Sequence, residues 1–221
     1  IGPVVREVRA ALESAGMSHE VLVLDDASDD GTAAEAERAI GGAGRVVRRS
    51  GPRSLAAAVR DGFATARARC AVVMDADGSH PPEEVPSLVR AVLDGVVDIS
   101  VGTRYMPGGG SDWDSPLRRW ISLAGASLSR RVTGLADAGS GFFAVRRAGV
   151  PVSRLRDSGF KVLFDLLCIW EGEARVREVP YRFRRRRAGR SKFGLGVTLR
   201  FAVILLLVLR DPPSRRVRPQ V

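Results

Sequence analysis

Two short apolar runs of this chain each end in acidic residues, the first in Asp25 and Asp26, the second in Asp75 and Asp77. Side chains two positions apart on an extended chain point the same way, so Asp75 and Asp77 are expected to face one site. Carboxylate oxygens bind Mg²⁺ or Mn²⁺ well, and such ions often keep open positions for phosphate oxygens. The pattern predicts a divalent-metal site at Asp75 and Asp77, with Ser79 as a further ligand or water contact.

A structural alternative for these acids is helix capping. The loop after Asp77 runs into Pro81 and Pro82, and proline is favoured in the first turn of a helix. Acidic or hydroxyl side chains just before that turn could serve only to bind its free amide groups. A lone Asp-x-Asp is common, so its place at the end of an apolar run carries the prediction. His80 lies in the same loop, and we expect it to support the helix start rather than to bind metal.

Strand-like and helix-like segments alternate around these acids. The apolar runs typical of buried strands cover residues 21–24, 45–48, 71–74 and 98–101. The segments with helical periodicity cover residues 3–15, a stretch ending near 40, 54–68 and 81–93. Repeating units of about 25 residues in this order indicate an α/β fold, with a mostly parallel sheet and helices on both faces. Ligands bind such sheets at the carboxyl ends of the strands, where Arg104 would join the four acids.

The second half of the chain predicts further helices and strands, followed by a basic end. Helices are expected over 115–132 and 159–171, a turn over 137–142 leads into a strand, and one or two strands lie within 175–184. A basic run, an apolar run and a basic tail complete the chain. We expect a main domain over residues 1–184, followed over 185–221 by a basic loop, an amphipathic helix and the tail.

The apolar run at 195–209 is broken by Arg200 and flanked by basic residues. A helix that crosses a bilayer needs about 20 apolar residues, and this run is shorter. A helix lying in the membrane interface is the interpretation that fits best. A helix packed on the domain core and a short or paired spanning segment are the alternatives.

Charge is unevenly distributed along the chain. The net charge is +10 overall and +12 over residues 175–221, so residues 1–174 carry −2. A near-neutral body with a basic end suits an anionic membrane surface or an anionic substrate better than nucleic acid, and no nucleic-acid partner is expected. A nucleic-acid module, suggested by the pI of 11.1, is the alternative.

The two cysteines, Cys70 and Cys168, are far apart and form no CxxC pattern. This argues against a disulfide framework or a thiolate zinc site and fits a reducing compartment. The first residues also lack the basic region and apolar run of a signal peptide. We therefore expect a cytoplasmic protein, bound peripherally at the cytoplasmic face of a membrane.

Several motifs together resemble a known family. The chain contains, in this order, VLVLDDASDDGT, MDADGSHPPEE, GTRY, RRWIS, SGFFAVRR, GFKVLFDLL and AGRSKF. Each is modest alone, but their order and spacing over residues 3 to about 200 are similar to the family 2 glycosyltransferases with a GT-A fold. The similarity is greatest to the polyprenyl-phosphate (dolichyl-phosphate) mannosyltransferase branch. It implies a GT-A catalytic domain with a Rossmann-like sheet.

The resemblance implies a donor side of the site. Asp25 and Asp26 would contact the base or ribose of a sugar nucleotide. Asp75 and Asp77 would hold Mg²⁺ or Mn²⁺ against its diphosphate. The sugar pocket would be shaped by Asp137, Ser140 and Gly141.

The resemblance also implies an acceptor side. Arg104, Arg118 and Ser122 would bind the phosphate of a polyprenyl phosphate lipid. Arg186 and Lys192 would close over the donor and acceptor phosphates. A membrane protein is a further candidate partner.

The implied reaction is an inverting hexose transfer, with mannose from GDP-mannose as the expected donor. A lipid phosphate is already anionic at neutral pH, so it can attack the anomeric carbon without a general base. The site must instead bring two anions together, which requires a metal and basic side chains. Arginine suits this task because it binds phosphate through two donors at once. Asp77, Arg104 and Arg186 are the residues expected to act most directly.

The sequence departs from the family at its start. Members usually begin with a strand of the type VVIPTYNE, whereas this chain begins in the loop or helix that would follow, so the first strand is expected to be missing. This keeps a non-catalytic sugar-nucleotide-binding paralogue open. A UDP-sugar donor, for glucosyl transfer, or a saccharide acceptor on the same fold are further alternatives.

Overall fold

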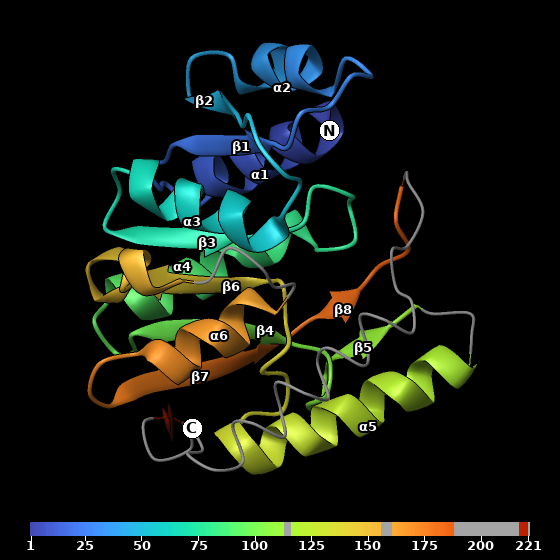
Figure 1. Ribbon diagram of the computed structural model, residues 1–221, viewed down its shortest axis with the longest axis vertical. Helices are drawn as coiled ribbons and strands as arrows, with labels where there is room; N and C mark the ends of the chain where they lie inside the picture. Colours follow the sequence, from blue (N-terminus) through green and yellow to red (C-terminus); the bar gives the residue numbers. More distant parts are fainter. Residues whose placement is uncertain (113–115, 156–160, 188–216, 221) are drawn as a thin grey trace.

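The computed structural model describes residues 1–112, 116–155, 161–187 and 217–220, without the side chains of 116–119 and 121. Its central sheet has five strands in the order β3 (Cys70–Val73), β6 (Phe143–Arg146), β4 (Ile99–Thr103), β7 (Ala174–Pro180) and β9 (Val217–Gln220) (Figure 1). The pairs β4–β7 and β7–β9 are parallel, while β6 runs antiparallel to both of its neighbours. The predicted mostly parallel α/β sheet is confirmed, with one reversed strand.

Two smaller strand pairs accompany the central sheet. β1 (Val21–Asp25) and β2 (Gly44–Arg48) form one parallel pair, and β5 (Gly110–Ser111) and β8 (Arg182–Phe183) form another. Among the described residues β1 is hydrogen-bonded only to β2, and β3 only to β6. The strand that we expect to be missing from the start of the chain stays a prediction.

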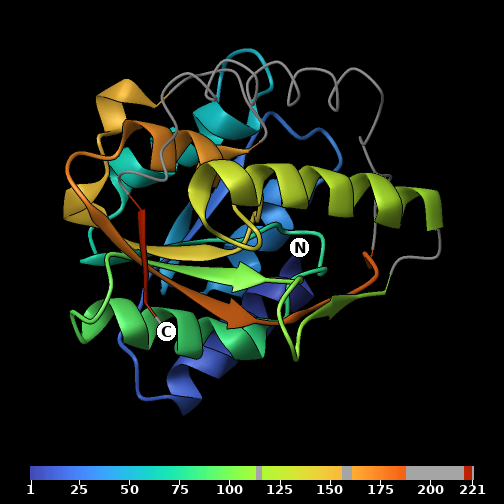
Figure 2. The same ribbon diagram turned by 90° about the horizontal axis from the view of Figure 1, so that it is seen from below.

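Helices cover both faces of the sheet, as predicted. They are α1 (Gly2–Ser14), α2 (Thr32–Ile40), α3 (Leu55–Thr65), α4 (Val85–Leu93), α5 (Pro116–Thr133) and α6 (Val162–Ile169). Short 3₁₀ turns cover Pro82–Glu84, Arg147–Gly149 and Val152–Arg154. Figure 2 shows α3, α5 and α6 on one side of the sheet and α1 and α4 on the other.

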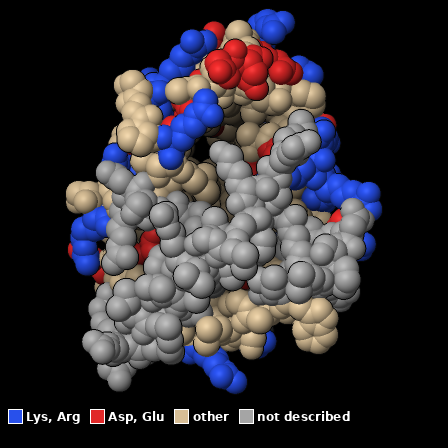
Figure 3. All heavy atoms as spheres, turned by 45° about the vertical axis from the view of Figure 1, so that its right-hand side comes forward, with Lys and Arg blue, Asp and Glu red and all other residues tan. Residues whose placement is uncertain are grey.

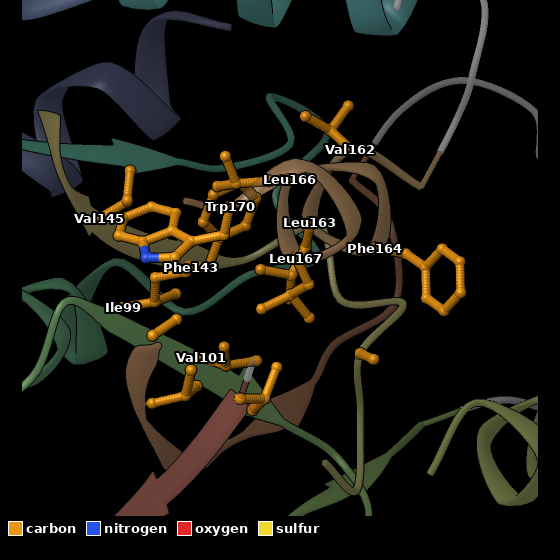
Figure 4. Close-up of a cluster of buried hydrophobic side chains, with 14 of the residues drawn as sticks. Ile99, Val101, Phe143, Val145, Val162, Leu163, Phe164, Leu166, Leu167 and Trp170 are labelled. Atoms are coloured by element: carbon orange, nitrogen blue, oxygen red, sulfur yellow. The ribbon is translucent and has the colours of Figure 1, made fainter. Parts of the chain in front are cut away.

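Alternation along β6 divides the core between these two faces. Phe143 and Val145 pack toward α3 and α6, in the larger apolar cluster drawn in Figure 4. Phe142 and Ala144 point the other way, toward α4 and Leu12 of α1. Both faces of the strand are buried, which explains its continuous apolar sequence.

The structure changes some predicted boundaries. The helix expected to open at Pro81 begins with the 3₁₀ turn Pro82–Glu84 and becomes α-helical at Val85. The helix expected to reach residue 68 ends at Thr65. β9 lies in the stretch predicted to be a basic tail and was missed, while the domain boundary at 184 stays a prediction.

Membrane insertion of the chain end is not described. The apolar run at 195–209 lies outside the described residues. Within the part that is described, no helix is both long and apolar enough to span a bilayer.

Asp98, at the start of β4, anchors two neighbouring strands. Its buried carboxylate accepts hydrogen bonds from the backbone and guanidinium of Arg175 and from Arg146. Burial acts to raise the pKa of Asp98, but the hydrogen bonds from Arg175 and the nearby positive charges outweigh it and hold the pKa below its ordinary value.

Replacement of this carboxylate should cost stability in a pH-dependent way. Asp98→Asn is expected to lower the free energy of unfolding at pH 7 by about 1–2 kcal/mol, discounted because both arginines are partly exposed. The folded-state pKa is lowered, so the contribution is present above the unfolded pKa of about 3.9 and is lost as pH falls below it. Urea unfolding at pH 7 and at pH 3 measures the difference, which should shrink at pH 3. Glu171→Gln, which removes an exposed ion pair with Arg154, should leave the free energy of unfolding unchanged at both pH values.

Candidate active site

Three of the predicted site residues lie on loops that follow strands of the central sheet. The loop after β3 carries Asp75 and Asp77, and the loop after β4 carries Arg104. Figure 3 views the molecule from this side and shows basic side chains along both flanks. Three elements distant in sequence therefore meet at one sheet edge: the ends of β3 and β4 and the segment 184–187 after β8.

His80 holds the loop after β3 in place from inside the core. The backbone N–H of Asp75 donates to its Nδ1 over 3.1 Å, and its ring stacks on Phe142 at a centroid distance of 5.0 Å. The side chain is only 1% exposed. Burial lowers the pKa of His80 to about 4, so the neutral imidazole can accept this hydrogen bond. The sequence predicted that His80 supports the helix start, whereas its printed hydrogen bond is to the backbone of Asp75, in the loop before that helix.

Asp77 is engaged at both carboxylate oxygens. Oδ1 accepts hydrogen bonds from the backbone N–H of Ser79 at 2.9 Å and from its hydroxyl at 2.5 Å. Oδ2 pairs with Nε of Arg186 at 2.8 Å. Ser79, which the sequence predicted as a further metal ligand or water contact, is fully buried and donates its hydroxyl to Asp77. Its part in a metal site stays a prediction.

Asp75 lies close enough to Asp77 for the two charges to repel each other. Burial and then the charge of Asp77 raise the pKa of Asp75 to about 6, against the opposing effects of Arg186, Lys161 and Arg104. Two carboxylates that share a poorly solvated site favour a bound cation, so the donor set fits Mg²⁺ or Mn²⁺. The residues that the structure describes contain no group of three or more acidic, His or Cys side chains that could complete a metal shell. Water or phosphate oxygens would have to supply the remaining ligands.

Arg104 and Asp137 form a buried ion pair with two parallel hydrogen bonds. Nε of Arg104 lies 2.7 Å from Oδ2 of Asp137, and Nη2 lies 2.9 Å from Oδ1. Their side chains are 11% and 2% exposed. The sequence assigned these residues to opposite halves of the site, the acceptor phosphate and the sugar pocket, but the structure joins them.

Glu178 supports this pair and was not predicted. Its carboxylate accepts hydrogen bonds from the backbone N–H groups of Ala136 at 2.9 Å and Asp137 at 3.0 Å. Burial raises the pKa of Glu178. Glu178 fixes the turn that presents Asp137, and nothing in the sequence pattern of β7 signals this role.

Lys161 is the second residue that the sequence analysis missed. Its Nζ donates to the carbonyl oxygen of Gly139 over 2.8 Å, just before α6. Burial, followed by the charge of Arg104, lowers the pKa of Lys161 to about 8, while Asp137 and Asp75 oppose the shift. One signal was present: Lys161 is one of only two lysines among the 35 basic residues.

The remaining acceptor-side residues are placed in part. The hydroxyls of Ser122 and Tyr105 hydrogen-bond each other, which ties α5 to the GTRY loop. The backbone of Arg118 lies in α5, one turn before Ser122, but its side chain is outside the description. Lys192 also lies outside the described residues.

The sugar-pocket candidates line the turn before β6. The hydroxyl of Ser140 caps this turn through the backbone of Phe142. Gly141 lies against the metal candidate: a Cβ there would stand 3.5 Å from Oδ1 of Asp75. That distance is an ordinary van der Waals contact, so the turn lies next to the acidic loop.

Asp25 and Asp26 lie at the end of β1, which pairs with β2 outside the central sheet. Asp25 is buried and accepts a hydrogen bond from the backbone N–H of Ser28 at 3.3 Å. Asp26 accepts one from the backbone N–H of Ser54 at 2.7 Å and pairs with Arg49. A pocket of about 350 Å³ opens beside this pair, lined by Val47, Arg48, Arg49, Ser50, Asp61, Ala64 and Thr65.

Comparisons with known proteins point to one family. Residues 2–150 match the family model "Glycosyl transferase family 2". The chain is 36% identical to the dolichol-phosphate mannosyltransferase of Mycosarcoma maydis, covering 94% of this chain and 74% of that protein. It is 34% identical to the undecaprenyl-phosphate mannosyltransferase of Micrococcus luteus, covering 84% and 80%. The dolichol-phosphate mannosyltransferase of Pyrococcus furiosus is 37% identical, but the match spans only 51% of its length.

Solved structures share the fold at lower identity. A mycobacterial protein superposes with a TM-score of 0.66 at 23% identity, covering 94% of this chain and 69% of that one. Glucosyl-3-phosphoglycerate synthase of Mycobacterium tuberculosis, in complex with Mn²⁺, UDP and phosphoglyceric acid, gives 0.65 at 19% identity, covering 95% and 75%. The sheet with its acidic loop is thus a glycosyltransferase fold, and the chain belongs to glycosyl transferase family 2.

Proposed function

We propose that the protein transfers mannose from GDP-mannose to a polyprenyl phosphate, with inversion at the anomeric carbon. One observation carries the proposal: Asp77 pairs with Arg186 at 2.8 Å, and the neighbouring Asp75 lies within electrostatic reach of Arg186, Lys161 and Arg104. Such a site suits the meeting of two phosphate-bearing substrates. The names of the relatives, mannosyltransferases acting on dolichol and undecaprenyl phosphates, support this choice of sugar and acceptor.

The reaction needs charge neutralisation more than proton transfer. A phosphate monoester oxygen is a nucleophile at neutral pH, so the site has to overcome repulsion between the acceptor phosphate and the donor diphosphate. The guanidinium of Arg104 lies over the ring of Tyr105, whose hydroxyl hydrogen-bonds Ser122. Arg104 would hold the acceptor phosphate. Arg186 and Lys161 would face the diphosphate as the bond to the sugar breaks.

The acids of the loop after β3 would supply the metal side. Asp75 and Asp77 would hold Mg²⁺ or Mn²⁺, which stabilises the charge of the departing nucleoside diphosphate. Gly141 leaves room for the sugar beside Asp75. Asp25 and Asp26 would border the nucleoside at the end of β1.

The exposed face of α5 supports a site at the membrane surface. Trp120 is 73% exposed, and Leu123 and Leu128 are 39% and 36% exposed on the same helical stripe. Arg131 extends this stripe at the end of the helix. An apolar stripe next to basic residues, on the helix that carries Ser122, suits peripheral contact with an anionic bilayer that contains the lipid acceptor. The cytoplasmic face is the side that we expect.

Removal of the largest apolar side chain should weaken this contact. Trp120→Ser is expected to reduce binding to vesicles containing anionic lipid about tenfold, because an indole ring at the interface contributes roughly 1–2 kcal/mol. Vesicle sedimentation measures the partition coefficient. Leu93→Ser, at a position 44% exposed at the end of α4, is the matched control and should bind as the wild type does.

A transfer assay tests the proposed function. Incubation with labelled GDP-mannose, polyprenyl phosphate and Mg²⁺ should yield a labelled lipid that extracts into organic solvent. Transfer from UDP-glucose alone would replace the donor in this proposal. Nucleotide binding by calorimetry, without transfer from any donor, would instead identify a non-catalytic relative.

A further inference from the structure

We propose that Arg186 occupies, in the unliganded chain, the place on Asp77 that the metal ion takes, so that Arg186 and the metal compete for one carboxylate oxygen. The proposal rests on the proposed metal site. Arg186 would have two successive partners: first the carboxylate of Asp77, and then, once the metal is bound, the phosphates of the substrates.

The geometry leaves one oxygen for both cations. Oδ1 of Asp77 already accepts two hydrogen bonds from Ser79, and Oδ2 is taken by Nε of Arg186 at 2.8 Å. The side chains of Arg186 and Asp77 are 32% and 18% exposed, so solvent only partly screens the pair. A metal bound through Oδ2 would compete with this guanidinium for the same oxygen.

The backbone on either side of Arg186 is tied to the same acidic loop. The N–H of Arg184 donates to the carbonyl oxygen of Ser79 at 2.8 Å, and the N–H of Arg187 donates to that of Asp77 at 2.9 Å. The guanidinium of Arg187 further binds both oxygens of Glu7 in α1, at 2.6 and 2.9 Å. Arg186 is therefore delivered to Asp77 by a segment fixed at both of its ends, and the contact is a preorganised one.

Exchange of Arg186 for a metal ion on Asp77 would keep the charges of the site balanced. The positive charge of Arg186 offsets part of the repulsion between the carboxylates of Asp75 and Asp77. A divalent ion takes over that task when it enters, and the freed guanidinium can then bind the phosphate oxygens that arrive with it. The acids and the phosphates are thus each neutralised in turn by one side chain.

Direct measurement of metal affinity tests the competition. Mn²⁺ is titrated into the full chain without nucleotide, and free Mn²⁺ is followed by electron paramagnetic resonance. Arg186→Gln should bind Mn²⁺ about tenfold more tightly than the wild type, since a charge-assisted hydrogen bond no longer opposes entry. Arg184→Gln is the matched control, because it removes an exposed pair with Glu83 from the same segment, and its affinity should be unchanged.

The other outcomes are equally informative. Equal affinity in wild type and Arg186→Gln, together with loss of binding in Asp77→Asn, would overturn the competition and leave the metal site standing. Absence of Mn²⁺ binding in every variant would overturn the competition and the metal site together.

Discussion

Asp77→Asn is expected to lower the rate of hexose transfer by a factor of about 10²–10³, comparable to the loss of one strong electrostatic contact in an active site. The substitution keeps the size of the side chain, and Asn can still accept the hydrogen bonds that Ser79 donates to Oδ1. It removes the negative charge that faces Arg186 and the proposed metal. The initial rate of labelled-lipid formation at saturating substrates measures the effect.

The fold should tolerate this change. Asp77 lies in a loop, is 18% exposed, and contributes no side chain to the apolar clusters. The thermal unfolding midpoint of Asp77→Asn should therefore stay within about 4 °C of the wild type, which corresponds to less than roughly 1 kcal/mol. An active Asp77→Asn enzyme, or one that is inactive only because it is unfolded, would contradict the role proposed for this carboxylate.

Local patterns predicted the elements and the acidic loop because both signals are short in sequence. A buried strand followed by Asp75 and Asp77 is a contiguous pattern, and the rule that ligands meet parallel sheets at their carboxyl ends brought Arg104 to the same edge. In each case the information lies within a few residues of the feature.

Pairings between distant segments were beyond the sequence. Arg104 and Asp137 are 33 residues apart, and Glu178 reaches the backbone of Asp137 across 41 residues. The sequence around a single Arg, Asp or Glu in a loop does not indicate which residue it will pair with. Arg104 and Asp137 were therefore predicted to have separate functions. In the folded chain β4 pairs with β7, and the turn before β6 contacts residues from both strands and their ends.

The direction of β6 and the edge strand β9 were not predicted, for a different reason. β6 is apolar from Phe143 to Val145, like a parallel strand, because these residues are buried on both faces of the sheet. Its reversal depends on the long path through α5. β9 contains Pro219, which argues against a central strand. Here β9 pairs only with β7 among the described strands, and a strand with one partner tolerates the missing N–H.

The pair of Arg104 and Asp137 allows stability and catalysis to be separated. Asp137→Asn leaves the charge of Arg104 buried with a neutral partner, so the free energy of unfolding should fall by about 3–5 kcal/mol. Arg104→Gln should have a similar effect by leaving Asp137 uncompensated. The double variant Arg104→Gln/Asp137→Asn removes both charges and should recover much of that loss. Urea unfolding of the four proteins measures the coupling free energy.

Activity should follow a different pattern across the same four proteins. The double variant lacks the guanidinium proposed to hold the acceptor phosphate, so its transfer rate should stay at least about 10²-fold below the wild type although its stability recovers. Arg104→Lys keeps a charge but not the two parallel donors and should be intermediate in both measurements. Additive losses of stability in the double variant would show that the pair is not coupled. Recovered transfer in the double variant would assign Arg104 to the fold alone, since a group that acts on the substrate cannot be rescued by removing its partner.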